Sequence, residues 1–406
     1  MRRAAWMLLL ALAFAIPWEY SLDFGPPLGN IARLAALALL LAILLAVFRA
    51  GQLRGPGSLL WLVLGLYLWF CCSCFWTIDR AESLHQLRSY AQELMIAWFV
   101  WELVDTPRHL RDVMRAYVAG AWLLALLTLG SFAVASTPEQ VRFAAASQDP
   151  NDMARFLVLA FPLAAALVGS ESTRQGKLLA AGYLPFGLLG VLLTASRSGF
   201  LAAMVALAGC GVLLFLTRRR AFTVSLYALP AILAGMWLTI PQQTLERVAS
   251  IPAELERGDL NQRLDIWEAG WQAFVHAPFF GSGAGSFVVA AGLAPIDTAH
   301  NTALTIAVEG GIVGLLLATA IVVVSAACVV QLPGPLRIAL AAALLALLLS
   351  SVVATVQENR ATWLLLGLIA AAARLAVEQP ASLAAVFPAH AQHAALQALP
   401  EPGLPG

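Results

Sequence analysis

Apolar runs long enough to cross a membrane recur about twelve times along this chain, and they constrain its fold more than any other feature. Backbone groups inside hydrocarbon must find their hydrogen-bond partners within the chain, which favours helices there. We therefore predict an all-α polytopic integral membrane protein with about 12 transmembrane helices. The runs lie near residues 5–17, 31–48, 58–76, 88–104, 114–135, 153–170, 178–194, 199–217, 221–240, 302–330, 338–356 and 361–377.

The composition leads to the same class. Of the 406 residues, 61% are hydrophobic and 12% are charged, and the mean hydropathy is +0.81. Such a chain has too little polar surface to coat a soluble globule, so the lipid bilayer is its first expected partner. The formal net charge of +1 argues against a nucleic-acid partner. All five cysteines lie in apolar runs and are typical of small buried hydrophobic residues, not of metal ligands or a disulfide framework.

The distribution of charge predicts an orientation. Alternate loops carry most of the cations, and cations in short loops favour the cytoplasm, so both termini are predicted to be cytoplasmic. These cations are Arg2, Arg3, Arg49, Arg54, Arg108, Arg111, Arg174, Lys177, Arg218, Arg219, Arg220 and Arg337. The opposite face still holds several arginines, and an anionic ligand would explain their presence there. Its charged positions are Asp23, Arg80, Arg142, Asp149, Asp152, Arg197, Arg360 and those of residues 241–301.

Two segments stand apart from the apolar runs. Residues 241–301 form a long polar loop, in which we predict an amphipathic helix near 262–276 that ends before Pro278. Its apolar positions are spaced by three and four residues, at Leu264, Trp267, Trp271 and Phe274, and Asp259 or Asn261 can cap its start. We treat residues 1–377 as one transmembrane domain and residues 378–406, rich in alanine and proline, as a disordered cytoplasmic tail.

A histidine lies where the long polar loop enters an apolar run, in Asp297-Thr-Ala-His300-Asn301-Thr. A neutral imidazole can accept a proton from a hydroxyl group at neutral pH, so His300 is the candidate general base. Asp297 can orient the ring if the region is helical, and Asn301 can cap the helix that follows. The alternative for His300 is a structural hydrogen bond at the start of that helix.

Glu309 falls inside the same apolar run, where an ionised carboxylate is costly, so we expect it to pair with an arginine or to line a wet cavity. Nearby Gly310, Gly311 and Gly314 have the small-residue spacing that permits close helix packing. Earlier in the chain, Gly281-Ser-Gly-Ala-Gly-Ser286 lacks the lysine of a phosphate-binding loop and indicates a flexible hinge.

Four arginines are candidates for contact with an anion, because a planar guanidinium matches phosphate oxygens. Arg197 lies in a tight outer turn, and Arg263 lies in the first turn of the predicted amphipathic helix. Arg197 can instead be an interfacial anchor, and Arg263 can pair with Asp259 or Glu256. Arg142 and Arg360 are weaker candidates.

The outer face offers little for a metal ion. Asp149 and Asp152 are its one suggestive pair of carboxylates, and beside Pro150 they are more typical of turn and cap residues. We therefore predict a site without a metal and without another cofactor.

Five motifs in order, between about residues 140 and 320, give the chain a resemblance to a known family. They are Asp149-Pro-Asn-Asp152, Thr194-Ala-Ser-Arg197-Ser-Gly199, Arg263-Leu-Asp-Ile-Trp267, Gly281-Ser-Gly-Ala-Gly-Ser-Phe287 and His300-Asn301 before Glu309-Gly-Gly311. The chain resembles the O-antigen ligase and polymerase superfamily, and its length is most similar to that of the lipopolysaccharide O-antigen ligases.

This resemblance implies a GT-C-like glycosyltransferase of the bacterial inner membrane, with the 241–301 loop and the active site on the periplasmic side. The expected donor is a glycan on undecaprenyl diphosphate, and the expected acceptor is a sugar hydroxyl of lipid A core. A donor that is already activated suits a compartment without nucleotide sugars or ATP.

In such an enzyme we expect His300 to deprotonate the acceptor, while Arg197 and Arg263 bind the diphosphate leaving group. Arg142, Asp297, Asn301, Glu309 and Arg360 complete the predicted substrate-binding set. Two alternatives stay open: a polymerase that uses the same lipid-linked glycan as donor and acceptor, and a transporter of lipid-linked glycans, which would carry more charges near the middle of the bilayer.

Overall fold

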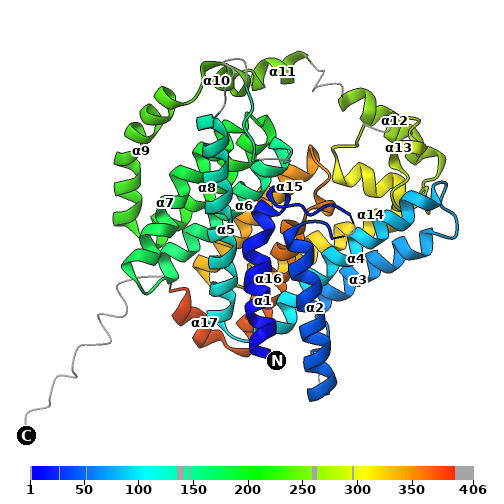
Figure 1. Ribbon diagram of the computed structural model, residues 1–406, viewed down its shortest axis with the longest axis horizontal. Helices are drawn as coiled ribbons and strands as arrows, with labels where there is room; N and C mark the ends of the chain where they lie inside the picture. The colour runs from blue at the N-terminus through cyan, green and yellow to red at the C-terminus, as the bar shows by residue number, and fades with distance from the viewer. Residues whose placement is uncertain are drawn as a thin grey trace, which may run out of the picture.

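The protein folds almost entirely into helices (Figure 1). The computed structural model describes residues 2–26, 28–51, 53–134, 141–145, 148–257, 263–294 and 297–388. Outside the helices of these segments, the extended structure consists of an isolated bridge between Asp23 and Asn30. The all-α prediction is confirmed.

Each of the twelve predicted runs contains a helix. They are α1 (Arg2–Ala15), α2 (Ile31–Ala50), α3 (Ser58–Ser73), α4 (Arg80–Leu103), α5 (Pro107–Val134), α6 (Pro150–Ser170), α7 (Arg174–Leu193), α8 (Arg197–Thr217), α9 (Arg219–Thr239), α14 (Thr302–Val330), α15 (Gly334–Val352) and α16 (Arg360–Glu378). Within the described segments, ten are long and apolar enough to cross a membrane, α1 together with the 3-10 turn Ile16–Ser21. The exceptions are α3, which has 16 residues, and the more polar α4.

The two exceptions, α3 and α4, pack against each other (Figure 1). The 24 residues of α4 span about 36 Å at 1.5 Å per residue. Near one end of this pair, the Trp101 indole donates to the Gly55 carbonyl at 3.1 Å. Near the other end, the Ser83 hydroxyl donates to the Ala284 carbonyl, and the Ala284 amide donates to the Ser73 hydroxyl. The pair therefore extends from the segment before α3 to the 281–286 turn.

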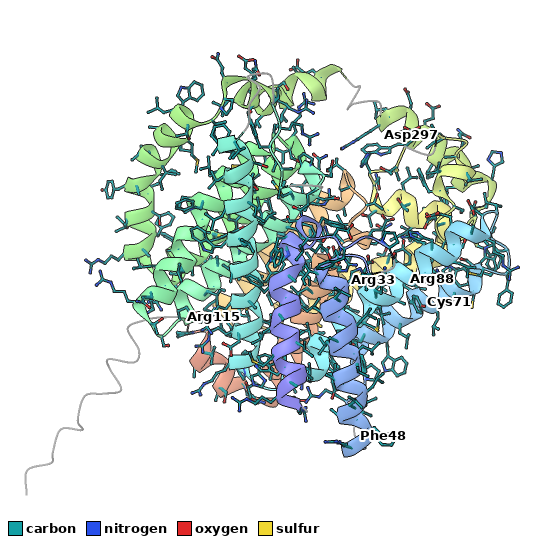
Figure 2. All side chains as sticks on the ribbon, viewed as in Figure 1. Arg33, Phe48, Cys71, Arg88, Arg115 and Asp297 are labelled. Carbon is teal, nitrogen blue, oxygen red and sulfur yellow. The ribbon has the colours of Figure 1, made fainter. Side chains whose placement is uncertain are left out.

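Several of the cations that we predicted to share a face do meet at one end of the bundle. Arg2 and Arg54 both pair with Asp105, at 3.1 and 2.8 Å, and Arg218 donates to the Gly169 carbonyl. Figure 2 shows Arg115, which pairs with Glu171, toward this end and Asp297 at the opposite end.

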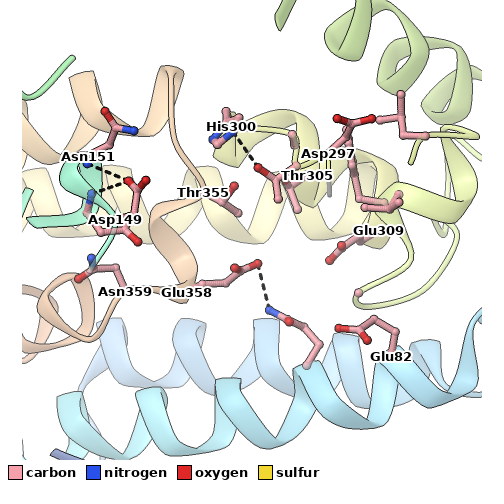
Figure 3. A pocket seen from close by; sticks show the side chains of 18 of the residues that line it. Glu82, Asp149, Asn151, Asp297, His300, Thr305, Glu309, Thr355, Glu358 and Asn359 are labelled. Carbon is pink, nitrogen blue, oxygen red and sulfur yellow. Dashed lines mark hydrogen bonds between the residues drawn. The ribbon is translucent and has the colours of Figure 1, made fainter. Parts of the chain in front are cut away.

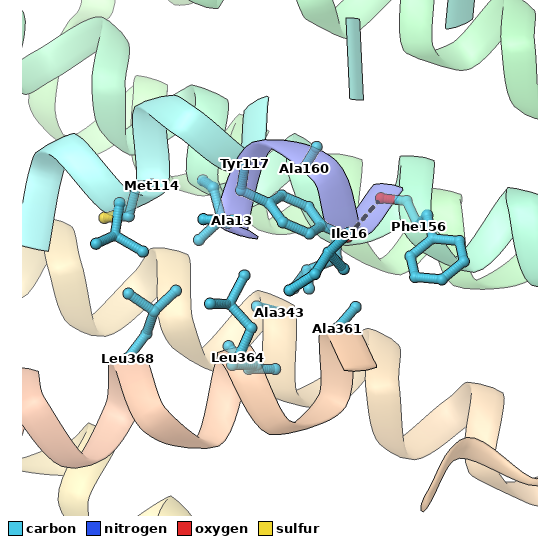
Figure 4. Packing of buried hydrophobic residues seen from close by; sticks show 14 of the residues in the cluster. Ala13, Ile16, Met114, Tyr117, Phe156, Ala160, Ala343, Ala361, Leu364 and Leu368 are labelled. Atoms are coloured by element: carbon cyan, nitrogen blue, oxygen red, sulfur yellow. Dashed lines mark hydrogen bonds between the residues drawn. The ribbon is translucent and has the colours of Figure 1, made fainter. Parts of the chain in front are cut away.

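The centre of the bundle is formed by α6, which is the most enclosed of the candidate spans. It packs against α5, α7, α8 and α15, and it contributes small side chains such as Ala160 that let its neighbours approach closely. The Tyr117 hydroxyl of α5 satisfies its hydrogen bond within this apolar core by donating to the Phe156 carbonyl at 3.0 Å (Figure 4). In contrast, α9 lies at the edge of the bundle, with 6% of its membrane-length window buried.

Short helices and loops cover the end of the bundle opposite Arg2, Arg54 and Arg218 (Figure 1). These helices are α10 (Gln242–Ala249), α11 (Ile251–Arg257), α12 (Arg263–His276) and α13 (Phe287–Ala290), all within the long polar loop. Helix α12 lies where the amphipathic helix was expected, whereas its proposed caps Asp259 and Asn261 lie outside the described residues.

The buried face of α12 differs from the predicted stripe. It is made by the small residues Gly270 and Ala273, while Leu264 and Trp271 are 42% and 56% exposed. A Cβ atom at position 270 would lie 2.9 Å from the Phe287 ring, so only glycine permits this approach. Two positions of the stripe, Trp267 and Phe274, are partly buried, and Phe274 packs beside Ala273 and Phe287. The stripe is therefore used only in part for packing within the protein, and contact of Leu264 and Trp271 with a membrane stays a prediction.

Helix α14 is broken at Gly311, which has φ 64° and ψ −163°. The loop after α12 fills the break: the Ile312 amide donates to the Pro278 carbonyl at 2.8 Å, and the Gly283 amide donates to the Glu309 carbonyl at 2.9 Å. The Trp69 indole of α3 donates to the Gly310 carbonyl at 2.8 Å. The glycines therefore do permit close packing, as predicted, and a loop as well as a helix fills the space.

The same contacts correct the prediction of a flexible hinge at residues 281–286. Gly281, Gly283 and Gly285 all have positive φ values, and their backbone lies against α4 and α14. The glycines serve a tight, clamped turn, because a side chain at these positions would collide with neighbouring backbone.

The prediction of a disordered tail from residue 378 does not hold for its first part. Helix α17 (Pro380–Val386) packs against α5 and α16, with Leu383 and Phe387 buried. Apolar residues in this stretch therefore dock on the bundle. Residues 389–406 lie outside the described segments.

We expect Gly311→Ala to destabilise the protein by about 2 kcal/mol or more, because alanine is strained at this φ and its Cβ would lie 2.7 Å from the Gly281 nitrogen. Gly314→Ala is the matched control, since its nearest neighbours would be 3.5 Å away. Thermal unfolding of both variants in detergent, followed by size-exclusion chromatography, measures the difference. Equal melting temperatures for the two variants would contradict the clamped break.

Candidate functional site

A cavity of about 730 Å³ lies next to α12 and α13, at the end of the bundle opposite Arg2, Arg54 and Arg218. Its walls come from α4, α6, α12, the loop before α14, α14 itself and the segment 353–359. Its charged and histidine side chains are Asp79, Glu82, Asp149, Asp152, Arg155, Arg263, Asp297, His300, Glu309 and Glu358. A polar cavity enclosed by membrane helices is a default binding site.

His300 lies on this wall, just before α14. Its backbone has φ 44°, in the left-handed region that few residues other than glycine adopt. The following residue, Asn301, caps α14 by accepting from the Leu304 amide at 3.0 Å, as predicted. The strained backbone at His300 turns the ring toward the cavity instead of continuing the helix (Figure 3).

The ring is held by a different partner from the one we expected. His300 Nε2 lies 3.0 Å from the Thr298 hydroxyl oxygen, whereas the Asp297 carboxylate accepts from the Ala294 amide at 3.2 Å. The segment around Asp297 is not helical, so the one-turn spacing that would bring its carboxylate to the ring is absent. Asp297 instead contributes its carboxylate to the same cavity.

Burial lowers the pKa of the His300 imidazole below its ordinary value of 6.5, and the positive charges of Arg263 and Arg155 lower this pKa further. The charged form is disfavoured because it loses hydration and lies near two cations. His300 is therefore neutral at neutral pH, which is the form that can accept a proton.

Arg263 is the first residue of α12 and reaches the cavity from above it. Across the described residues, its guanidinium makes no hydrogen bond and no ion pair, so the suggested pairing with Glu256 is absent. The other suggested partner, Asp259, lies outside the described residues. Burial lowers the pKa of this guanidinium below its ordinary value of 12.5, while Asp149 acts in the opposite direction. A half-buried cation without a partner leaves its donors for a ligand.

The cavity contains a second arginine that was not predicted as a site residue. Arg155 lies in the first turns of α6, pairs with Asp152 and is 16% exposed. It falls inside a run that we assigned to the membrane, so it was not considered as a site residue. The signal was present, because Asp152 and Arg155 are one helical turn apart and a charge inside a membrane helix indicates function.

Asp149 and Asn151 are organised by the turn that begins α6. The Asp149 carboxylate caps the helix by accepting from the Asn151 amide at 2.8 Å, in agreement with the predicted cap. The Asn151 side-chain oxygen accepts from Arg142 at 3.0 Å and from the Ser196 hydroxyl at 2.9 Å. Arg142 therefore lies behind the cavity wall and holds Asn151 in place.

Two other predicted arginines are absent from the cavity lining. Arg197 donates to the Arg247 carbonyl at 3.1 Å and to the Ser250 hydroxyl at 2.8 Å, which ties α8 to the end of α10. Arg360 pairs with the buried carboxylate of Glu19. The structure thus brings Arg263, Asp297, Glu309 and His300 together at the cavity, and it does not bring Arg142, Arg197 or Arg360 there.

Carboxylates occupy the other end of the cavity (Figure 3). Glu309 lines it, as one of our two alternatives predicted, and is 3% exposed. Glu82 of α4 and Glu358 of the turn Val356–Glu358 lie near it. We missed Glu82 and Glu358 because no motif connects segments so distant in the sequence. Across the described segments, no group of three histidine, cysteine, aspartate or glutamate side chains is arranged to hold a metal ion.

Comparison with known families gives a match over the part of the chain that contains α12 and His300. Residues 183–319 match the family model described as O-Antigen ligase. A search of curated proteins finds no match. The matched range includes Arg197, Arg263 and His300, and it excludes Arg155 and the carboxylates of α4 and of the 356–358 turn.

We expect Arg263→Gln to raise the pKa of His300, because a neighbouring positive charge is removed, and Arg263→Lys to leave that pKa nearly unchanged. Carbethoxylation, which modifies the neutral imidazole, measures this pKa when the His300 peptide is quantified by mass spectrometry as a function of pH. The peptide with the exposed His276 serves as the reference for reagent activity. Identical midpoints for the two variants would mean that Arg263 exerts no field at His300.

Proposed function

We propose that this protein is a ligase that transfers a glycan from undecaprenyl diphosphate to lipid A core. The O-antigen ligase domain at residues 183–319, by which the chain belongs to the O-antigen ligase and polymerase superfamily, supports this proposal. The observation that carries this proposal is that one cavity holds a neutral imidazole, His300, and a guanidinium, Arg263, that has no hydrogen-bond or ion-pair partner among the described residues. The guanidinium can bind a phosphate group, and the imidazole can accept the proton of a hydroxyl group.

The diphosphate of the donor would lie against Arg263 and Arg155. Both guanidinium groups line the cavity at the end where Asp149 lies, and both are partly removed from water, which strengthens their interaction with an anion. Arg155 would exchange some of its contact with Asp152 for phosphate oxygens. As the bond to the sugar breaks, negative charge grows on the leaving diphosphate, and fixed cations stabilise it without a metal ion.

His300 would act on the acceptor. Its imidazole accepts the proton of the attacking hydroxyl as the acceptor oxygen bonds to the anomeric carbon of the donor sugar. The bond between that carbon and the diphosphate oxygen breaks in the same step, and undecaprenyl diphosphate leaves with the electron pair. The hydrogen bond between His300 Nε2 and the Thr298 hydroxyl, together with the strained backbone at His300, holds the ring in a defined orientation. The proposed role needs the tautomer in which Nε2–H donates to Thr298 Oγ1, because Nδ1 is then left to accept the proton.

The proposed membrane orientation follows the charges. The end with Arg2, Arg54 and Arg218 would face the cytoplasm, with both termini, and the cavity would face the periplasm of the bacterial inner membrane. In the periplasm, the bond between the sugar and the diphosphate of the lipid-linked donor supplies the free energy for the transfer.

Arg197 receives a different role from the one its motif suggested. Because its guanidinium contacts Arg247 and Ser250, we assign it to positioning the 241–257 segment above the cavity, not to direct contact with the diphosphate. Arg142, through Asn151, would be a positioning residue of the same kind.

We expect His300→Ala to lower kcat by about 10²- to 10⁴-fold, because the general base is removed. Arg263→Ala should raise the KM for the lipid-linked donor by about 10- to 100-fold, through the loss of charged hydrogen bonds. Arg80→Ala is the matched control, since this exposed arginine begins α4 outside the cavity lining. Transfer by purified protein in nanodiscs measures all three, and wild-type rates for His300→Ala would refute the assigned base.

The identity of the acceptor distinguishes a ligase from a polymerase and from a transporter. With donor and lipid A core both supplied, we expect the glycan on lipid A core, and with donor alone we expect no product. A strain that lacks the protein should accumulate lipid-linked glycan and truncated lipopolysaccharide. Chain growth on the polyprenyl carrier without lipid A core would indicate a polymerase, and donor movement across the membrane without a covalent product would indicate a transporter.

A further inference from the structure

The carboxylate end of the cavity is left without a role by the chemistry proposed above. Three glutamates from separate elements line it: Glu82 from α4, Glu309 from α14 and Glu358 from the turn Val356–Glu358. Figure 3 shows His300 between Asp149 on one side and Glu309 and Glu82 on the other. The two arginines of the cavity lie near Asp149 and Asp152, whereas Glu309 and Glu82 lie on the other side of the candidate base.

Glu309 is the most confined of these groups. It is 3% exposed, and backbone N–H groups of the 285–287 turn hold its carboxylate. Among the described residues, its Oε2 atom has no hydrogen-bond partner. An acceptor that is buried and unsatisfied costs free energy unless a ligand provides the missing donor.

Glu358 and Gln86 complete this wall. The Gln86 amide donates to one carboxylate oxygen of Glu358 at 3.2 Å, which orients the group and leaves its other oxygen for a second donor. Glu82 lies on the same face of α4 as Gln86, one turn earlier, and its carboxylate is exposed.

The spacing of these carboxylates favours a ligand with several donors over a single cation. Within the described part of the chain, no three of them are arranged to hold a metal ion. A sugar ring presents hydroxyl donors around its perimeter, and carboxylates on different sides of a cavity can each accept from one of them.

We propose that Glu309, with Glu358 and Glu82, forms the subsite for the acceptor sugar, which these carboxylates hold by its hydroxyl groups so that one hydroxyl faces His300. This inference rests on the proposed glycan transfer, and it assigns the two ends of the cavity to the two substrates. With the diphosphate on the two arginines and the acceptor sugar on the three glutamates, donor and acceptor would be oriented before reaction.

The test separates the two substrates. We expect Glu309→Gln, which keeps the size of the side chain and replaces one of its acceptor oxygens by an amide nitrogen, to raise the KM for lipid A core on the order of tenfold or more while the donor KM stays within twofold. Glu358→Gln, on a different element, should act in the same direction. Glu268→Gln is the matched control, because this exposed glutamate on α12 is absent from the cavity lining.

A binding measurement makes the subsite testable without turnover. Core oligosaccharide released from lipid A and labelled with a fluorophore should bind the wild-type protein in nanodiscs without donor, and more weakly the Glu309→Gln and Glu358→Gln variants. If wild-type protein transfers no glycan but the variants still lose this binding, the subsite stands and the proposed function falls.

Three results would overturn the subsite. Unchanged acceptor KM and unchanged oligosaccharide binding in both variants would show that the carboxylates do not hold the acceptor. A rise in donor KM alone would assign them to the donor. Transfer that requires Mg²⁺ or Ca²⁺ in the wild-type protein, with a metal requirement that shifts in Glu309→Gln, would make this end a cation site.

Discussion

The break in α14 is the constraint on which the site depends. Inside a membrane domain, backbone groups that leave a helix must find partners in the protein, and the Pro278–Gly285 loop supplies them at Gly311. Because the loop is bound to α14 in this way, its next residues reach Glu309, and α13 packs against α12 and α14. One interruption thus joins the polar loop to the membrane helices and sets the shape of one side of the cavity.

The walls of the cavity come from different layers of the structure, and each layer contributes charged side chains. Helix α6 brings Arg155 from within the bundle, and α12 brings Arg263 from the covering layer. Helix α4 and the 356–358 turn bring carboxylates from the other side. His300 lies between these groups, where the cations lower its pKa and keep it neutral. A base that is neutral beside an anion-binding end is the arrangement that the proposed transfer requires.

Some of the site could be predicted and some could not, for physical reasons. His300, Arg263 and Glu309 lie in or beside ordered motifs, and all three line the cavity. Arg197 and Arg142 were expected at the ligand because they lie on the outer face, and Arg197 also because it lies in a tight turn within a family motif; in the structure both contact other parts of the protein and neither lines the cavity. Arg155 was missed because a membrane-spanning segment is identified from its mean hydropathy, and a single charged residue changes that mean little.

The sequence by itself determined that this is a helical membrane protein and where its helices lie, because the length of an apolar run and the need to satisfy backbone hydrogen bonds are local properties. It also determined the clustering of cations at one end. Only the tertiary structure decided which charged side chains share a cavity, that α14 is broken, and that the glycines of residues 281–285 form a clamped turn. Those outcomes depend on contacts between segments up to about 270 residues apart, such as Gln86 with Glu358, which no local pattern encodes.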